Sequence, residues 1–294
     1  EEVSRMFWDS FGTSWGGYSN DGKTLRGSFD RAVGQSPLHC VSAWATSRGV
    51  SLGSVSVCDK SNEITAIPQL LELLEVQGCV VTLDAMGCQK NIASKIREKK
   101  ADYVLALKGN QGNLHKGIRA FFETELESGF KECSHTYSET EDKGHGRIEV
   151  RRCWSTNNIG WLKQEEDWKD LCSINMVEST RSIVDPATKA LKSTTEVRFF
   201  ISSLPAEATK IAKAIRQHWG IENSLHWVLD VTFNEDKSRI RKDRAPENFS
   251  VLRKIALSIL KNASHKRKSI RGRRKIAGWD ERFFFNAIFG QQKQ

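Results

Sequence analysis

Over the first 110 residues of the chain, short apolar runs typical of strands alternate with segments whose apolar residues recur at the 3- and 4-residue spacing of a helix. Two strands are predicted at residues 38–47 and 50–58, which are rich in Val, Cys, Trp and Ser, and the Arg48-Gly49 pair between them favours a hairpin turn. Apolar residues at 3- and 4-residue spacing then predict a helix capped by Ser61 or Asn62. The residues with this spacing are Ile64, Ile67, Leu70, Leu71 and Leu74.

A parallel α/β unit is predicted next. Residues 78–84 and 103–107 are nearly continuous apolar runs, the pattern of strands buried on both faces of a parallel sheet. Residues 89–99 between them have helical spacing, so strand, helix and strand follow in order. From about 131 to 203 polar and apolar residues alternate, which predicts a β-rich insertion, and a long helix follows Pro205. The pattern therefore predicts an α/β protein.

The positive charge of the chain lies near its C-terminus. The net charge is +9, yet residues 237–275 hold fifteen Lys or Arg against only Asp243 and Glu247, which is +13, so the rest of the chain carries −4. Such a segment suits a polyanion, because each phosphate contact releases counterions. A solvated basic helix and tail is the alternative interpretation.

The cysteine and apolar content favours a cytoplasmic protein. The seven cysteines include no Cys-x-x-Cys pair and no zinc-like spacing with His, so we expect buried, reduced thiols. No apolar run approaches the roughly 18 residues that cross a bilayer, and no signal peptide is visible. The first residue is not Met, so we expect the chain to be the remainder of a longer one.

Asp21 and Asp84 are candidate ligands for a divalent metal ion, which needs oxygen donors that converge on one point. Asp84 ends an apolar run and would lie at the sheet edge where open α/β folds bind ligands, although capping the next turn explains it equally well. Asp21 stands in an Asn-Asp-Gly sequence, which on local pattern alone is simply a turn. Lys23 and Arg26 beside it are either solvated or face phosphate groups.

Glu222 is the exceptional residue of the long helix. It lies eleven residues beyond Ile211, within about 20° of the same face at 100° per residue, and Leu225 continues that apolar stripe. A carboxylate there must be paired, protonated or bound to metal, because burying a lone charge is unfavourable. His218 and His226, four residues away on either side, are alternative partners for it.

Six stretches of sequence point to a known family. They are DGKTLRGS at 21–28, KSNEIT at 60–65, VTLDAM at 81–86, LALKGNQG at 105–112, GHGRIEVR at 144–151 and HWGIENSLHWVLDV at 218–231. Together they resemble the ISAs1-type bacterial insertion-sequence transposases, an IS4-like DDE group that includes the H-repeat-associated proteins of Rhs elements. One such stretch would be weak support, whereas six in the family's order are specific.

The resemblance implies a ribonuclease H-like core, a mixed sheet flanked by helices, with a β-rich insertion before the helix that carries the last catalytic Glu. Asp21 on the first strand, Asp84 after the fourth and Glu222 on that helix would be the catalytic acids and would hold Mg²⁺ or Mn²⁺, two ions in all. The expected parts are a poorly patterned segment at 1–20, the core at 21–130 and 205–260, the insertion at 131–204 and a basic tail at 261–294.

The implied reaction is metal-dependent cleavage and strand transfer at insertion-sequence ends, that is, DNA transposition and recombination, in the bacterial cytoplasm at the nucleoid. The implied partners are double-stranded DNA and a second copy of the chain, with no membrane and no small-molecule cofactor. Basic residues beside the acids, in the insertion and near the C-terminus are the predicted DNA contacts. They are Lys23, Arg26, His145, Arg147, Arg216, His226, Arg239, Arg241, Lys266, Arg267, Lys268, Arg271, Arg273 and Arg274.

The chain departs from the family in two ways. Related transposases carry Tyr and Arg before the Glu and Lys after it, where this chain has Ile215, His218 and Leu229, so Arg216 or His226 would substitute. The usual apolar first strand and N-terminal domain are also missing, which predicts a truncated or rearranged copy with a poorly formed first strand. The alternatives to a working transposase are a catalytically inactive remnant that binds DNA and a nuclease that cuts without joining.

Overall fold

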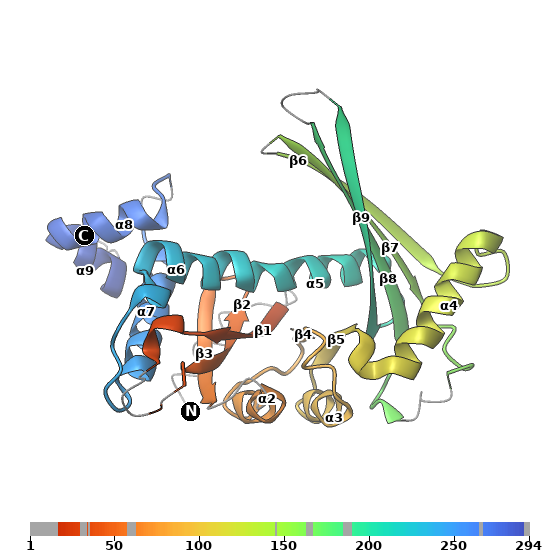
Figure 1. Cartoon of the computed structure of the whole chain (residues 1–294), viewed down its shortest axis with the longest axis horizontal. Coiled ribbons are helices and arrows are strands. Elements are labelled where there is room, and N and C mark those ends of the chain that lie inside the picture. Colours follow the sequence, from red (N-terminus) through yellow and green to blue (C-terminus); the bar gives the residue numbers. More distant parts are fainter. Residues whose placement is uncertain are drawn as a thin grey trace.

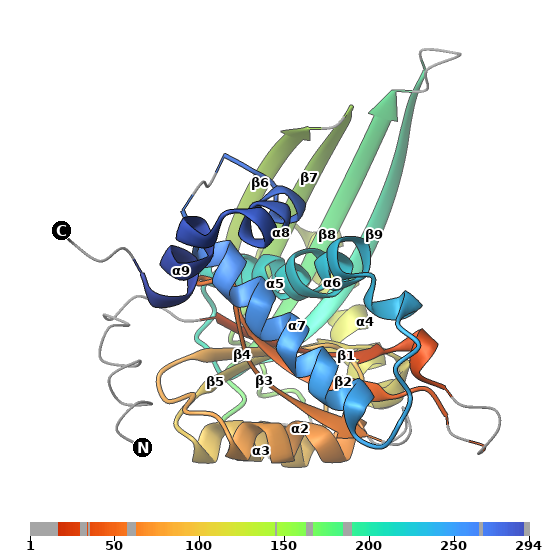
Figure 2. The ribbon, with the colours of Figure 1, turned by 90° about the vertical axis from the view of Figure 1, so that its left-hand side faces the viewer.

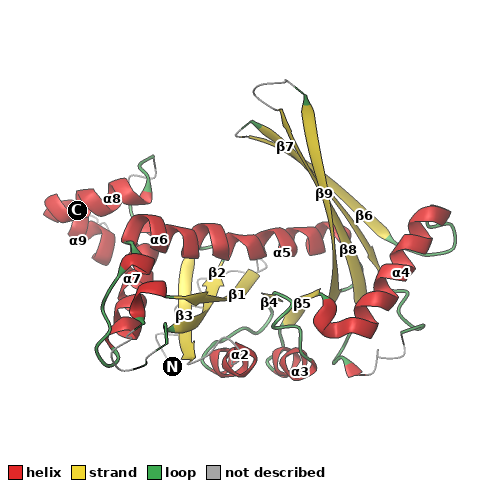
Figure 3. Ribbon diagram, in the orientation of Figure 1, coloured by secondary structure: helices red, strands yellow, loops and turns green. Residues whose placement is uncertain are grey.

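A single mixed sheet runs through the computed structural model, which describes residues 17–29, 34, 36–57, 63–144, 146–162, 167–184, 190–264 and 267–290. The sheet has nine strands in the order β3-β2-β1-β4-β5-β9-β8-β7-β6. Helices cover both faces of the part formed by the first five strands, and the remaining strands project beyond it (Figure 1 and Figure 3). Strands far apart in the sequence therefore share one sheet.

The first five strands form the core of the sheet. β1 (Gly17–Thr24), β2 (His39–Ala45) and β3 (Val50–Val57) are antiparallel neighbours. β4 (Val80–Leu83) pairs parallel to β1, and β5 (Asp102–Leu107) pairs parallel to β4. Three antiparallel strands followed by parallel ones in the order 3-2-1-4-5 form a ribonuclease H-like core, so the predicted fold class is confirmed.

Strand β1 contradicts the prediction of a poorly formed first strand. It is paired with β2 on one side and with β4 on the other, and the residues from Gly17 to Asn20 are buried. Its polar side chains meet a helix, since Ser19 Oγ lies 3.4 Å from the carbonyl oxygen of Gln217. A Cβ at position 17 would lie 2.6 Å from Gln217 Oε1, so glycine permits this close approach. Helix packing, rather than a missing strand, explains the unusual sequence.

Helices lie on both faces of the core. α2 (Glu63–Glu72) and α3 (Lys90–Glu98) cover one face. The other face is crossed by α5 (Ala208–Ile221), which continues through a π-helical turn (Glu222–His226) into α6 (Trp227–Phe233) (Figure 1). The predicted helices after residues 62, 89 and 205 are thereby confirmed, and the long third helix passes over the middle of the sheet.

The β-rich insertion predicted at 131–204 extends the same sheet. Its strands are β6 (Thr136–Gly144), β7 (Arg147–Thr156), β8 (Ser173–Val184) and β9 (Leu191–Ser202). They are antiparallel, and β9 pairs with the core strand β5. The long strands β6–β9 therefore extend past the N-terminal end of α5, and α4 (Gly112–Ser128) lies beside the part of these strands that is nearest the core (Figure 1).

The C-terminal helices pack against α6 and the outer core strand β3 (Figure 2). They are α7 (Ala245–Asn262), α8 (Ile270–Trp279) and α9 (Glu281–Phe289). The segment predicted as a basic tail thus contains two helices in its described part. Short 3-10 turns lie at Arg26–Ser28, Gly109–Gln111 and Glu235–Lys237. Among the described helices, none combines the length and apolar character needed to cross a lipid bilayer.

Two leucines near the C-terminal end of α2 test the packing of this helix. Leu70 is fully buried, whereas Leu73 is 75% exposed. Leu70→Ala is expected to lower the free energy of unfolding by about 2–5 kcal/mol, because it removes buried methyl groups and leaves a cavity. Leu73→Ala should lower it by less than about 0.5 kcal/mol. Urea titration followed by circular dichroism measures both values, and equal losses would contradict this packing.

Candidate active site

The three predicted acids line one cavity of about 330 Å³. Asp21 lies on β1, Asp84 directly follows β4, and Glu222 begins the π-turn after α5. The parallel register of β1 and β4 pairs Asn20 with Leu83, so the two aspartates occupy the next positions on neighbouring strands. Adjacent strands are about 4.8 Å apart. The sheet thus brings the aspartates together, and α5 brings the glutamate to them.

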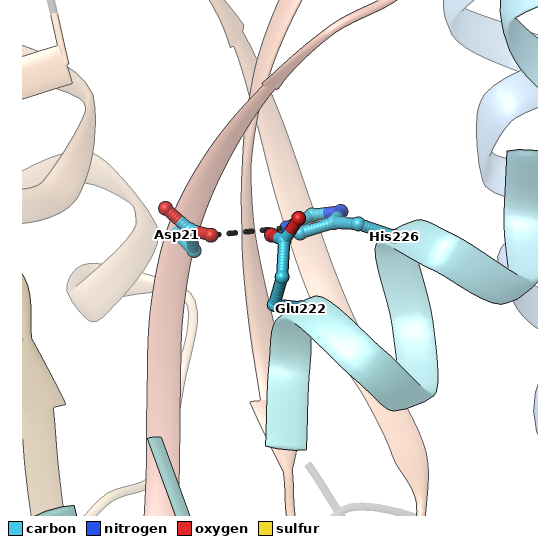
Figure 4. A group of neighbouring side chains, drawn as sticks. All are labelled: Asp21, Glu222 and His226. Carbon is cyan, nitrogen blue, oxygen red and sulfur yellow. Dashed lines mark ion pairs between the residues drawn. The ribbon is translucent and has the colours of Figure 1, made fainter. Parts of the chain in front are cut away.

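A tighter group within this cavity consists of Asp21, Glu222 and His226. One ligand atom of each residue lies within 4.8 Å of those of the other two. Figure 4 shows the glutamate and the histidine pointing from the two ends of the π-turn toward Asp21. Nε2 of His226 lies 3.5 Å from Oδ2 of Asp21, which is a long contact between ionisable groups. Asp84 lines the same cavity without belonging to this group.

The two aspartates have opposite pKa shifts. Burial raises the pKa of Asp84, and the negative charges of Asp21 and Glu63 raise it further. Burial also acts to raise the pKa of Asp21, but the contact with His226 and the charges of His226 and His218 outweigh it, so this pKa is lowered. Neighbouring carboxylates of this kind repel each other, and a bound cation would relieve the repulsion.

The donor atoms of the cavity fit a hard divalent cation. The Glu222 carboxylate is exposed, which corrects the burial expected from the apolar stripe, and it lies beside Asp21 without a hydrogen bond or ion pair to any residue of the described ranges. Oδ1 of Asp84 accepts the N–H groups of Met86 at 3.1 Å and Gly87 at 3.2 Å, which fixes the orientation of that carboxylate. Carboxylate oxygens are the ligands that Mg²⁺ and Mn²⁺ prefer in proteins.

Two further residues around the acids, Thr82 and Lys108, were not singled out by the sequence patterns. Thr82 Oγ1 lies 3.1 Å from Nδ1 of His218, which joins β4 to α5 beneath the cavity. Lys108 directly follows β5 and lines the cavity. Its position at the end of a buried parallel strand is a signal that could have identified it, since such strand ends meet at one sheet edge. Thr82 stands inside an apolar run and carries no such signal.

Lys23 and Arg26, predicted as DNA contacts, lie differently in the structure. Nζ of Lys23 lies 2.8 Å from Oδ1 of Asp230 and 2.9 Å from Oδ1 of Asp236, and its side chain is only 11% exposed. Lys23 therefore joins β1 to the region after α5 instead of facing a phosphate group, which corrects the prediction. Arg26 is 83% exposed, with Nε 3.5 Å from Asp236, and remains accessible.

The residues in and near the insertion that were predicted as DNA contacts also lie in different environments. Arg147 and Arg216 line cavities between the insertion and α5. His226 is buried beside Asp21 and is not placed to meet DNA backbone, so its predicted DNA contact is corrected to a place in the acid cluster. His145 lies outside the described residues.

The basic C-terminal residues fall into an exposed and an internal group. The exposed ones are Arg239, Arg267, Lys268 and Arg271. Arg273 is buried and donates to two backbone carbonyls of α7, which corrects its predicted role as a DNA contact. Arg241 and Arg274 are half-buried and each donates to a backbone carbonyl. Lys266 lies outside the described residues.

Comparison with known proteins gives relatives over most of the chain. The family described as "Transposase DDE domain" matches residues 9–259. The putative transposase YncI of Escherichia coli O157:H7 is 45% identical over 256 residues, which are 87% of this chain and 64% of that protein. The H repeat-associated putative transposase YhhI of Escherichia coli strain K12 is 39% identical over 273 residues, 92% of this chain and 70% of that protein. The chain thus spans about two thirds of the length of these relatives.

Among solved structures, the piggyBac transposase synaptic complex with hairpin DNA aligns with 99% of this chain and 59% of its own chain, at a TM-score of 0.46 and 11% identity. At that level of similarity the fold assignment depends on the strand order of this chain itself. The family match, in contrast, extends over well more than half of the sequence. This chain therefore belongs to the transposase DDE domain family.

Proposed function

We propose that the chain is a DDE-type transposase that cleaves DNA at the ends of an insertion sequence and transfers the freed strand to target DNA. The observation that supports this most is the convergence of Asp21, Asp84 and Glu222 on one cavity at the edge of a ribonuclease H-like sheet. The family implies the use of divalent metal, and we propose Mg²⁺ or Mn²⁺ as the ion. Asp21 and Glu222 would hold it, with Asp84 as the third acid.

The reaction consists of two phosphoryl transfers. Water attacks a phosphorus atom at the element end, the P–O3′ bond breaks, and the leaving 3′ oxygen takes up a proton as a hydroxyl group. That hydroxyl then attacks a phosphodiester of the target and displaces its 3′ oxygen in line. Two divalent ions, when bound, activate the attacking oxygen and stabilise the leaving one. The role of Asp21, Asp84 and Glu222 is to fix the ions and the scissile phosphate relative to each other.

Double-stranded DNA is the proposed partner of the basic C-terminal region. The exposed residues Arg239, Arg267, Lys268 and Arg271 lie outside the acid cavity, where phosphate contacts would position the duplex without reading its sequence. An insertion sequence has two ends, and each chain contributes one acid cluster. We therefore propose a homodimer as the active assembly.

Replacement of Glu222 tests the proposed chemistry. With Mg²⁺ or Mn²⁺ and a supercoiled plasmid that carries the ends of the element, the protein is expected to nick and join DNA. Glu222→Gln should lower the cleavage rate about a thousandfold, because it removes a charged oxygen ligand and leaves the shape of the side chain. Gel electrophoresis of the products measures both steps.

The control is Glu207→Gln, at the start of the same helix, where the carboxylate pairs with Lys210 and does not line the cavity. This variant should retain the activity of the wild type. Cleavage without joining would indicate a nuclease. Salt-sensitive DNA binding without any cleavage would support an inactive remnant and refute the proposed activity.

Metal binding can be measured without DNA. Saturating Mn²⁺ is expected to raise the Tm of the protein by about 5 °C or more, because a ligand that binds only the folded state stabilises it. Asp21→Asn and Glu222→Gln should remove most of this rise, whereas Glu207→Gln should keep it. Differential scanning calorimetry measures the shifts, and equal shifts in all four proteins would place the metal elsewhere.

Asp84 is expected to stabilise the metal-free protein when it is neutralised. Burial and the charge of Asp21 raise the pKa of Asp84, so its ionised form opposes folding at neutral pH. Asp84→Asn removes that charge, and its amide oxygen can still accept the N–H groups of Met86 and Gly87. In EDTA at pH 7 the variant should melt a few degrees higher than the wild type while it loses cleavage activity. A lower Tm would show that the carboxylate is not under electrostatic strain.

A further inference from the structure

Helix α5 runs up to the strands of the insertion (Figure 1), and two cavities lined by both adjoin the acid cavity. The acid cavity shares Arg198 and Trp219 with a second cavity of about 410 Å³, and the second shares the same two residues with a third of about 520 Å³. We name the second and third cavities the insertion groove. The residues common to both are Arg151, Ser179, Arg198, Arg216 and Trp219. The shared lining residues place this groove next to the acid cavity.

The insertion groove is positively charged. Six cationic side chains line it, namely Arg147, Arg151, Arg181, Arg198, Lys213 and Arg216, against the three carboxylates of Asp142, Glu149 and Glu196. The carboxylates form ion pairs with arginines of the same groove. Lys213 and Arg181 form no ion pair with a residue in the described ranges. The surplus of cations favours an anionic occupant.

An aromatic side chain stands where the groove meets the acid cavity. Trp219 is 40% exposed and is the aromatic residue that lines all three cavities. The guanidinium carbon of Arg198 lies 4.5 Å from the centre of its ring, which holds the indole in place. Trp219 lies three residues before Glu222 on the same helical segment. A cationic path with an aromatic side chain is the arrangement that binds unpaired nucleotides, because every base has a face that stacks.

The volumes of the cavities fit one DNA strand. Each cavity has the volume of a site for a small organic molecule, which suits a single nucleotide. We propose that the insertion groove binds about two unpaired nucleotides of a DNA strand that leads into the acid cavity, with one base stacked on Trp219. The inference rests on the proposed transposase function. It adds a single-strand site that is separate from the basic C-terminal surface.

Binding in EDTA tests this site independently of catalysis. The probes are a fluorescein-labelled duplex with a single-stranded extension of four nucleotides, made with either polarity, and the same duplex with blunt ends. Fluorescence anisotropy is expected to show about tenfold tighter binding of one extended duplex than of the blunt one. Trp219→Ala should abolish this preference, and Trp219→Phe should retain most of it because a flat ring remains.

The matched control is Trp161→Ala, because Trp161 is 39% exposed but does not line the groove. It should leave the preference unchanged. Lys213→Ala should lower the salt dependence of binding to the extended duplex, with a slope smaller by about one phosphate contact. Circular dichroism of each variant checks that it is folded.

Two results would overturn the inference: equal binding of blunt and extended duplexes by the wild type, or a preference that survives Trp219→Ala. Failure of the proposed function gives a different pattern. A protein that does not cleave DNA with metal present, yet keeps a Trp219-dependent preference for the extension in EDTA, would have the single-strand site without the catalytic one. A protein that cleaves with no such preference would lack the site.

Discussion

The packing of helix α5 across strands β1 and β4 is the contact on which the proposed site depends. The glutamate of the acid set lies far along the chain from the two aspartates and on the opposite side of the insertion in sequence. It reaches them only because the helix lies close to the sheet. Gly17 lies beside the Gln217 side chain, and Thr82 Oγ1 lies 3.1 Å from Nδ1 of His218, so small and polar residues join the two layers.

A second set of contacts holds the far end of this helical segment. Lys23 on β1 binds Asp230 and Asp236, which lie in and after α6. Burial acts to lower the pKa of Lys23, but these two carboxylates outweigh it and raise that pKa, so the ammonium stays charged inside the fold. With the π-turn held at both ends, Glu222 and His226 face Asp21. Lys23, which the sequence indicated as a DNA contact, therefore helps to hold the acids in place through its ion pairs with Asp230 and Asp236.

The sequence predicted most of the architecture and the position of the acids, for identifiable reasons. The apolar run ends at Asp84 because buried strands must be apolar. Glu222 was singled out because it interrupts an apolar stripe, but the structure leaves its side chain exposed, so the argument from a buried charge was wrong. Asp21 was placed on a strand by family resemblance alone, since its local sequence indicates a turn. The prediction of a defective first strand was wrong because its polar and glycine residues are adapted to a helix that comes from the other end of the chain.

Features of the fold that depend on contacts between distant parts of the chain could not be predicted from local sequence patterns. Periodicity indicates that residues 191–202 form a strand, but not that this strand continues the core sheet beside β5. Positive charge likewise does not distinguish an exposed Arg271 from Arg273, which is buried against backbone carbonyls. The cavities between α5 and the insertion depend on the pairing of β9 with β5, because they lie where the extended sheet passes the helix.

Asp21, Asp84 and Glu222 are proposed to form a common site for divalent metal. Anomalous diffraction from a crystal of the protein soaked in Mn²⁺ tests it most directly, because the signal locates the ion among the side chains. We expect an anomalous peak within coordination distance of the carboxylates of Asp21 and Glu222, with Asp84 beside it. A peak elsewhere, with this cavity empty at saturating Mn²⁺, would contradict it.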